Sequence, residues 1–217
     1  DSRWGAVRAA EGHPEPYPLA YVEIGNENFG PIYDRRYNMF YKAIKEKYPD
    51  LTLISNYGLE GSEGADTIEM VDPHWSVAPQ HFFNTTRLID NYERGKHDIY
   101  VGEYSCNQNV GGGNMLAALS EAAFLTGIER NGDIVKMASY APLIENRNDR
   151  AWPVNLIWVD NDQVVGRSSY YVQKMFAQNR PDYNLKVNAD IKSADSAPLI
   201  GVDSYIGLGT WSTQTQF

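Results

Sequence analysis

The chain has 217 residues, a length that favours one domain or one domain and part of another. It carries 28 acidic against 19 basic side chains, a formal net charge of −9. We therefore expect no nucleic-acid partner and no anionic membrane surface, because phosphate binding needs a surplus of Lys and Arg. No apolar run approaches the ~18 residues that cross a bilayer. The single cysteine, Cys106, excludes an intrachain disulfide and a cysteine-based zinc site.

The first half of the chain alternates short apolar runs with amphipathic segments. We predict strands over 19–24, 51–55 and 67–74, because each is apolar and bounded by turn residues. A helix is predicted over 33–48, where apolar residues recur on one face and Pro49 follows.

The next elements continue the alternation. A helix is predicted over 79–94 with Gly95 at its C-terminal end, and a strand over 98–102. An Ala- and Leu-rich helix follows over 114–130, and a strand over 135–144. Strands that alternate with helices indicate βαβ units and a parallel sheet, so the fold class is α/β.

The chain ends in a different pattern. A short helix is predicted over 168–178, after which polar and apolar residues alternate between Gly and Ser turns. We therefore predict one α/β domain over 1–181 and the beginning of a β-rich domain over 182–217. The second segment is too short to close a sandwich or barrel, so we expect that domain to be incomplete.

Polar clusters follow the predicted strands. Glu27 and Glu103 each come after an apolar strand and a nearby glycine, and His74 lies between them in the sequence. Sugar hydrolysis needs two carboxyl groups, one that protonates the leaving oxygen and one that stays ionised. Taken alone, either glutamate also fits a helix cap or a surface salt bridge, and His74 fits a hydrogen-bonded structural histidine. The pair, with Asn26 before one glutamate and His74 and Trp75 between the two, shifts the balance towards a glycosidase and leaves the structural alternatives open.

Five motifs in this order resemble the α-L-arabinofuranosidases of glycoside hydrolase family 51. They are residues 21–30 (YVEIGNENFG), 72–75 (DPHW), 98–105 (DIYVGEYS), 141–144 (APLI) and 169–176 (SYYVQKMF). The resemblance covers most of the chain. It implies a partial (β/α)8 TIM barrel comprising strands four to eight, followed by the start of a β-rich C-terminal domain.

The resemblance also implies roles for individual residues. Glu27 is expected to be the acid/base, and Asn26 to hold the sugar 2-hydroxyl group. Glu103 is expected to be the nucleophile of a retaining reaction. His74 is expected to contact both the nucleophile and the sugar.

Further residues are expected to line the sugar pocket. These are Trp75 beside His74, and Trp152 and Asn155 after strand eight. Two positions depart from the family pattern, because relatives carry Tyr at the position of Ser76 and many carry Asp at that of Asn155. Both departures concern substrate detail more than mechanism.

The expected activity is therefore the removal of α-L-arabinofuranosyl residues from arabinose-containing oligosaccharides or polysaccharides, without a metal or another cofactor. The alternatives are another hydrolase of the same clan, such as a β-xylosidase or endoglucanase, and a non-catalytic carbohydrate-binding fragment. Since the early barrel strands do not fit before residue 19, we expect the isolated chain to be poorly active. A homo-oligomer is left open. We favour a periplasmic or secreted location over a cytoplasmic one.

Overall fold

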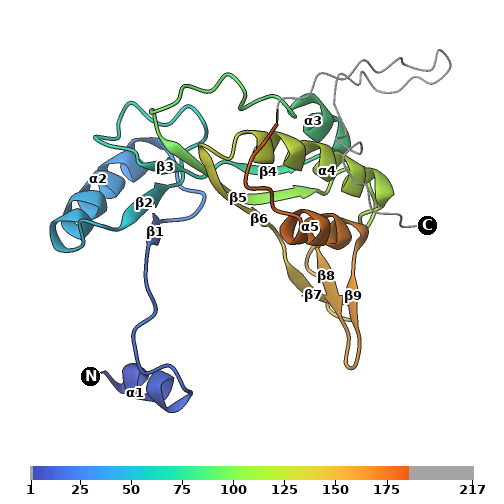
Figure 1. The fold of residues 1–217 in the computed structure, drawn as a ribbon, viewed down its shortest axis with the longest axis horizontal. Helices are drawn as coiled ribbons and strands as arrows, with labels where there is room; N and C mark the ends of the chain where they lie inside the picture. Colours follow the sequence, from blue (N-terminus) through green and yellow to red (C-terminus); the bar gives the residue numbers. More distant parts are fainter. Residues whose placement is uncertain (1, 186–217) are drawn as a thin grey trace. The chain divides into compact units, whose positions relative to one another are not determined.

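The structure is a computed structural model that describes residues 2–185 (Figure 1). The chain divides into two compact units, Asp1–Val71 and Asp72–Phe217, called unit 1 and unit 2 below. The β-rich domain expected over 182–217 falls almost wholly outside the described residues and stays a prediction.

Unit 1 contains two helices and three short strands. In chain order they are α1 (Arg3–Ala10), β1 (Tyr21–Ile24), α2 (Gly30–Lys47), β2 (Thr52–Ser55) and β3 (Met70–Val71). The strands β1, β2 and β3 pair in parallel in that order. Unit 1 is therefore a parallel sheet whose first two strands are joined by a crossover helix, as the alternation predicted. Helix α1 was not predicted, and it buries no residue.

The core of unit 1 is built on tyrosines. Tyr33 and Tyr37, one turn apart on α2, pack against each other and against Tyr57, with ring centroids 5.2–5.9 Å apart. Leu53 and Ile54 of β2 are also buried. Tilted and edge-on ring pairs of this kind add to the stabilisation by apolar burial and hold α2 against the sheet.

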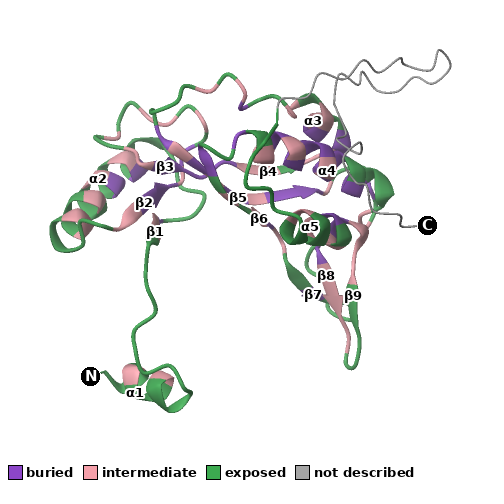
Figure 2. Ribbon diagram, in the orientation of Figure 1, coloured by how far each residue is buried: buried purple, intermediate pink, exposed green. Residues whose placement is uncertain are grey.

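Unit 2 contains the larger group of elements. In chain order these are β4 (His74–Val77), α3 (Pro79–Asn84), β5 (Asp98–Cys106), α4 (Met115–Arg130) and β6 (Val135–Tyr140). The long strand β5 is central, pairing in parallel with β4 on one side and β6 on the other. Figure 2 shows that β5 and the inner face of α4 are among the most buried parts of unit 2.

A second, three-stranded sheet and a last helix complete the described part of unit 2. The strands are β7 (Ile144–Asn146), β8 (Ile157–Val159) and β9 (Val164–Gly166), and the helix is α5 (Ser168–Gln178). Strand β8 pairs in parallel with β7 and antiparallel with β9. These strands are three residues each, too short to give a periodic signal, and they were not predicted.

Aromatic packing joins the helices of unit 2 to its central strand. Phe82 of α3, Tyr104 of β5 and Phe124 of α4 are all buried, and their ring centroids lie 5.2–6.4 Å apart. The side chain of Asn114 caps α4 by accepting a hydrogen bond from the Ala117 N–H group at 3.1 Å. The helix that carries Phe124 therefore begins at a defined residue.

The helix predicted over 79–94 is wrong beyond Asn84. At Thr85 both the backbone N–H group and the side-chain hydroxyl donate to the carbonyl of His81, at 3.0 and 2.8 Å, and the helix ends there. The following turns are held by the Arg94 guanidinium, which donates to three backbone carbonyls. They are the carbonyls of Ile89, Asp90 and Tyr92.

Three predicted strands have different bounds in the structure. The strand predicted over 67–74 is divided into β3 and β4, and Pro73, which has no N–H group to donate, lies in the gap. The strand predicted over 98–102 continues to the end of β5. The strand predicted over 135–144 stops with β6, just before Pro142, whose peptide bond is cis. Among residues 2–185, no helix is both long and apolar enough to cross a membrane.

Candidate functional site

Strand β1 ends in a tight turn that carries Asn26 and Glu27. Gly25 has φ +92° and Glu27 has φ +51°, so both lie in the left-handed region that side chains disfavour. A Cβ atom on Gly25 would lie 2.4 Å from Oδ1 of Asn28 and 2.7 Å from Oδ1 of Asn56. Asn28 Oδ1 accepts the Asn26 N–H group at 3.2 Å. Only glycine fits this position, and the turn it permits fixes the backbone at Glu27.

A hydrogen-bond network holds the backbone next to the turn that follows β1. The Tyr33 hydroxyl donates to the Ile24 carbonyl at 2.7 Å and accepts the Asn56 N–H group at 2.9 Å. The Asn56 side chain donates to Oε1 of Glu23 at 2.6 Å. Tyr33 and Asn56 therefore hold the ends of β1 and β2 together, and sequence reasoning had assigned no role to either.

Glu27 also lines a pocket within unit 1. The pocket has a volume of about 260 Å³ and opens at the N-terminal end of α2. Phe29 and Ile32 give it an exposed apolar wall, 84% and 58% exposed. Its full lining is Glu27, Asn28, Phe29, Ile32, Tyr33 and Arg36. Glu27 is itself an exposed residue, so a ligand can reach its side chain.

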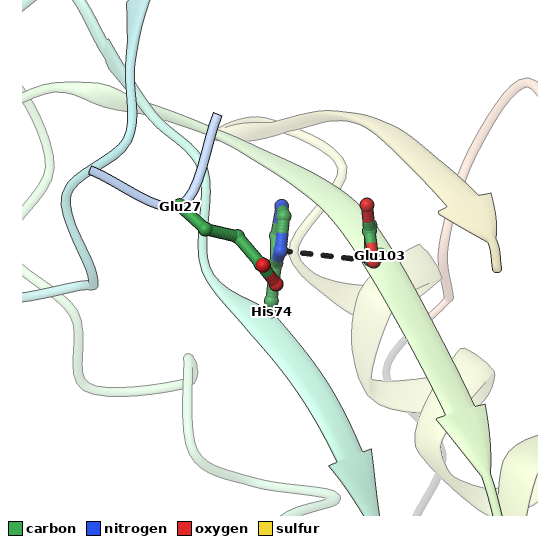
Figure 3. Close-up of side chains that lie close together, drawn as sticks. All are labelled: Glu27, His74 and Glu103. Carbon is green, nitrogen blue, oxygen red and sulfur yellow. Dashed lines mark ion pairs between the residues drawn. The ribbon is translucent and has the colours of Figure 1, made fainter. Parts of the chain in front are cut away.

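In unit 2, the sheet places His74 beside Glu103. The two residues are directly paired in the register of β4 and β5. Nδ1 of the His74 ring lies 3.8 Å from Oε2 of Glu103, and Figure 3 shows this ion pair as a dashed line. The His74 side chain is 17% exposed and that of Glu103 is 40% exposed. The structure thus places His74 beside Glu103, which lies within β5 and not after it, while the nucleophile role of Glu103 and the contact of His74 with the sugar stay predictions.

Asp72 lies in the DPHW motif, and the sequence assigned it no role of its own. Its carboxylate is almost fully buried; Oδ2 lies 2.7 Å from Nε2 of His74, and Oδ1 accepts the Gly102 N–H group at 2.6 Å. A Cβ atom on Gly102 would lie 2.2 Å from Oδ1 of Asp72, so the carboxylate occupies the space beside the glycine. The available signal was the spacing of Asp72 and His74, two residues apart in an extended segment.

Trp75 follows His74 on β4, where successive side chains point to opposite faces of the sheet. Its ring packs edge-on against Phe124 of α4, with centroids 5.4 Å apart. Trp75 therefore contributes to the packing between β4 and α4. Its expected contact with the sugar stays a prediction.

Trp152 and Asn155 lie in the segment between β7 and β8 and share a partner. The Glu145 carboxylate accepts the backbone N–H group of Trp152 at 2.7 Å and a hydrogen bond from the Asn155 side chain. The N–H group of Trp152, followed by that of Ala151, lowers the pKa of Glu145. Asn155 is fully buried, whereas the Trp152 side chain is 60% exposed. Their roles in sugar binding also stay predictions.

A second buried carboxyl group lies against the same central strand. Glu121 of α4 is fully buried, and its Oε1 accepts the Cys106 N–H group at the end of β5 at 2.7 Å. Burial raises the pKa of Glu121 to about 7, because a charged carboxylate is poorly solvated there. This residue was not predicted as functional, since a single Glu in an Ala-rich helix carries no distinguishing pattern.

Two family profiles match the chain in succession. Residues 1–94 match the alpha-L-arabinofuranosidase 1 domain, and residues 102–201 match the alpha-L-arabinofuranosidase C-terminal domain. The first match includes Asn26, Glu27 and His74, and the second includes Glu103.

Among curated proteins, the chain is 38% identical over 227 residues to an extracellular exo-alpha-L-arabinofuranosidase of Streptomyces chartreusis, which covers 100% of this chain. It is 42% identical over 181 residues to alpha-L-arabinofuranosidase 2 of Arabidopsis thaliana, which covers 82% of this chain. In each comparison the chain spans only 27% of the relative's length.

A solved structure gives the same result. An arabinose-bound α-L-arabinofuranosidase of family 51 superposes on 84% of this chain with a TM-score of 0.72 and 34% sequence identity, and 31% of that relative is covered. This likeness confirms the predicted partial (β/α)8 barrel. Together, the matched profiles, the relatives and the fold show that the chain belongs to the α-L-arabinofuranosidases of glycoside hydrolase family 51.

Proposed function

We propose that the full-length polypeptide carrying this chain is a retaining glycosidase that removes α-L-arabinofuranosyl residues from arabinose-containing oligosaccharides or polysaccharides. The observation that carries the proposal is the match to the arabinose-bound relative, because 34% identity together with a TM-score of 0.72 exceeds a likeness of fold alone. The names of the curated relatives agree with it.

We assign Glu103 as the nucleophile and Glu27 as the acid/base. Glu103 is supported by its 40% exposed carboxylate and by the neighbouring His74 ring, which when protonated is a cationic partner for an ionised carboxylate. Glu27 is supported by its turn and by the pocket it lines, where a leaving group can reach its carboxyl group. Asn26, adjacent in the turn, is proposed to hold the sugar 2-hydroxyl group.

The reaction then has two displacements. An oxygen of Glu103 attacks the anomeric carbon, the bond to the leaving oxygen breaks, and Glu27 gives its proton to that oxygen. In the second step Glu27 takes a proton from water, the water oxygen attacks the anomeric carbon, and Glu103 is released as a carboxylate. Each displacement inverts the anomeric carbon, so the configuration is retained overall. A retaining enzyme of this type requires carboxyl groups about 5–5.5 Å apart.

The proposed partner is the glycan, and the proposed location is periplasmic or secreted. The Streptomyces relative is named as an extracellular enzyme, which supports secretion. Homo-oligomer formation also stays a proposal.

Kinetics of point variants in the full-length polypeptide test the two roles separately. Glu103→Ala is expected to lower kcat by about 10⁴-fold on every aryl α-L-arabinofuranoside, since no covalent intermediate can form. Glu27→Ala is expected to lower kcat by about 10²–10⁴-fold on substrates with poor leaving groups. An activated leaving group needs no proton. With such a substrate, Glu27→Ala should therefore slow the first displacement far less.

Glu46→Ala on α2 and Glu93→Ala in unit 2 are matched controls, because both side chains belong to exposed residues. They should leave kcat within about twofold of wild type. A wild-type enzyme that cleaves aryl β-xylosides or β-glucosides but no arabinofuranoside would contradict the substrate. Near-normal turnover by Glu103→Ala would contradict the assignment of Glu103 as the nucleophile.

A further inference from the structure

Two buried carboxylates bond to the backbone of β5, one on each side of Glu103. Asp72 accepts the N–H group of Gly102 at 2.6 Å, and Glu121 accepts that of Cys106 at 2.7 Å. Each contact satisfies a buried backbone donor of the same strand. Both carboxylates are therefore able to stabilise β5, which alone would be a purely structural role.

Asp72 differs from Glu121 because its second oxygen contacts His74. Oδ2 lies 2.7 Å from Nε2 of the ring, and an ionised carboxylate can only accept a hydrogen bond. This contact places a proton on Nε2 and fixes the rotation of the ring. Nδ1, on the other side of the ring, is then directed at Oε2 of Glu103, 3.8 Å away.

The backbone of β5 holds Asp72 in this orientation. The Gly102 N–H group fixes Oδ1, and the missing side chain of Gly102 leaves room for the carboxylate. Gly102 precedes Glu103 on the strand, so one carboxylate is bonded both to the strand that carries Glu103 and to the histidine that faces it. The Asp72 carboxylate therefore aligns the His74 ring with Glu103.

We propose that Asp72 is a positioning residue for the Glu103 nucleophile and that it acts through the His74 ring. This inference rests on the proposed function, in which Glu103 attacks the sugar. Asp72 itself, almost fully buried, does not touch the substrate. Its role is to keep Nδ1 of His74 facing Glu103, so that the nucleophile is held in one geometry during attack.

The test compares Asp72→Asn with Glu121→Gln in the full-length polypeptide. The asparagine side chain would keep an oxygen for the Gly102 N–H group but present an amide N–H₂ group to the ring, so Nε2 loses its acceptor. We expect kcat to fall by about 10- to 100-fold, the range seen when a group that orients a reactive residue is lost, with KM within about threefold of wild type. Glu121→Gln should keep kcat within about threefold.

A double-mutant cycle shows whether the effect passes through the histidine. In the His74→Ala background, Asp72→Asn should cost less than about threefold in kcat, because the group it orients is absent. A merely structural role would give the same loss in both backgrounds. The proposal is overturned if Asp72→Asn alone keeps near-normal kcat, if Glu121→Gln loses as much, or if the two losses multiply.

His74→Gln tests the proposal even where Asp72→Asn does not fold. The glutamine amide can still donate to Asp72, but it provides no group in the place of Nδ1. The kcat of His74→Gln should equal that of His74→Ala, and wild-type kcat would overturn the proposal. The proposed function fails by a different result, in which the unmodified full-length polypeptide cleaves no arabinofuranoside.

Discussion

At the scale of single residues, two glycines position the candidate site. Gly102 lies inside β5, although a glycine after an apolar run was interpreted as the end of the strand. The strand continues through Gly102, and the Asp72 carboxylate lies beside it and accepts its N–H group. The sequence predicted Glu27, His74 and Glu103 as site residues. It could not predict the hydrogen bond between Gly102 and Asp72, because these residues are 30 positions apart in the chain.

Substitution of Gly25 is predicted to affect both stability and catalysis. Gly25→Ala in the full-length polypeptide would place a Cβ atom 2.4 Å from Asn28 and force the turn at Glu27 to move. We expect a loss of about 1–3 kcal/mol in the free energy of unfolding and a fall in kcat, because Glu27, the proposed acid/base, is displaced. Thermal unfolding and steady-state kinetics measure the two effects.

Gly12→Ala is the matched control, since Gly12 also has φ +92° but nothing within 4 Å of its added Cβ atom. Its substitution carries the backbone strain without the clash, so kcat should stay at the wild-type value. Equal kcat for Gly25→Ala and wild type would show that the turn does not position Glu27.

At the scale of elements, periodic segments were predicted well and short segments were not. Helices α2, α4 and α5 agree with the sequence pattern within about three residues. Helix α3 is shorter than predicted because the hydroxyl of Thr85 competes for the backbone and Arg94 satisfies the carbonyls of the turns that follow. Such contacts depend on tertiary structure and leave no periodicity in the sequence.

Glu121 gives the prediction for the contact between α4 and β5. Its pKa is raised from 4.5 to about 7, so between these pH values the unfolded chain binds fewer protons than the folded chain. Stability from this group is therefore fully present below about pH 4.5 and is lost as the pH rises through about 7. The loss is on the order of 3 kcal/mol.

Denaturant unfolding across this pH range measures the effect, with Glu121→Gln compared against wild type. Because the glutamine does not titrate, the free energy of unfolding of the variant should decline less between about pH 4.5 and pH 8. The exposed Glu93→Gln variant should follow wild type. Parallel stability curves for wild type and Glu121→Gln would contradict the raised pKa of the buried Glu121 carboxyl group.

At the scale of the whole molecule, the chain carries part of a (β/α)8 barrel. It spans 27–31% of the length of the relatives compared above, and a (β/α)8 barrel typically needs at least ~200 residues and eight strands. The alternation of strands and helices predicted the parallel α/β fold. The barrel was inferred from the family motifs, because periodicity does not specify how many strands a sheet contains.

The 217 residues alone are predicted to be at least ~100-fold less active than the full-length polypeptide. The reason is that groups from the other barrel strands also surround the sugar in a complete barrel, and small displacements of reacting groups are costly. Side-by-side rates on an aryl arabinofuranoside measure this. Equal specific activity would mean that the chain contains the whole site.

Trapping the covalent intermediate tests the central assignment most directly. In the full-length Glu27→Ala variant, an arabinofuranoside with an activated leaving group should still glycosylate the nucleophile, whereas water attack is slow without a base. After acid quench and proteolysis, mass spectrometry should find one anhydro-arabinose on the peptide containing Glu103, and Glu27→Ala/Glu103→Gln should give no adduct. An adduct on another residue, or turnover with inverted configuration and no adduct, would contradict the account.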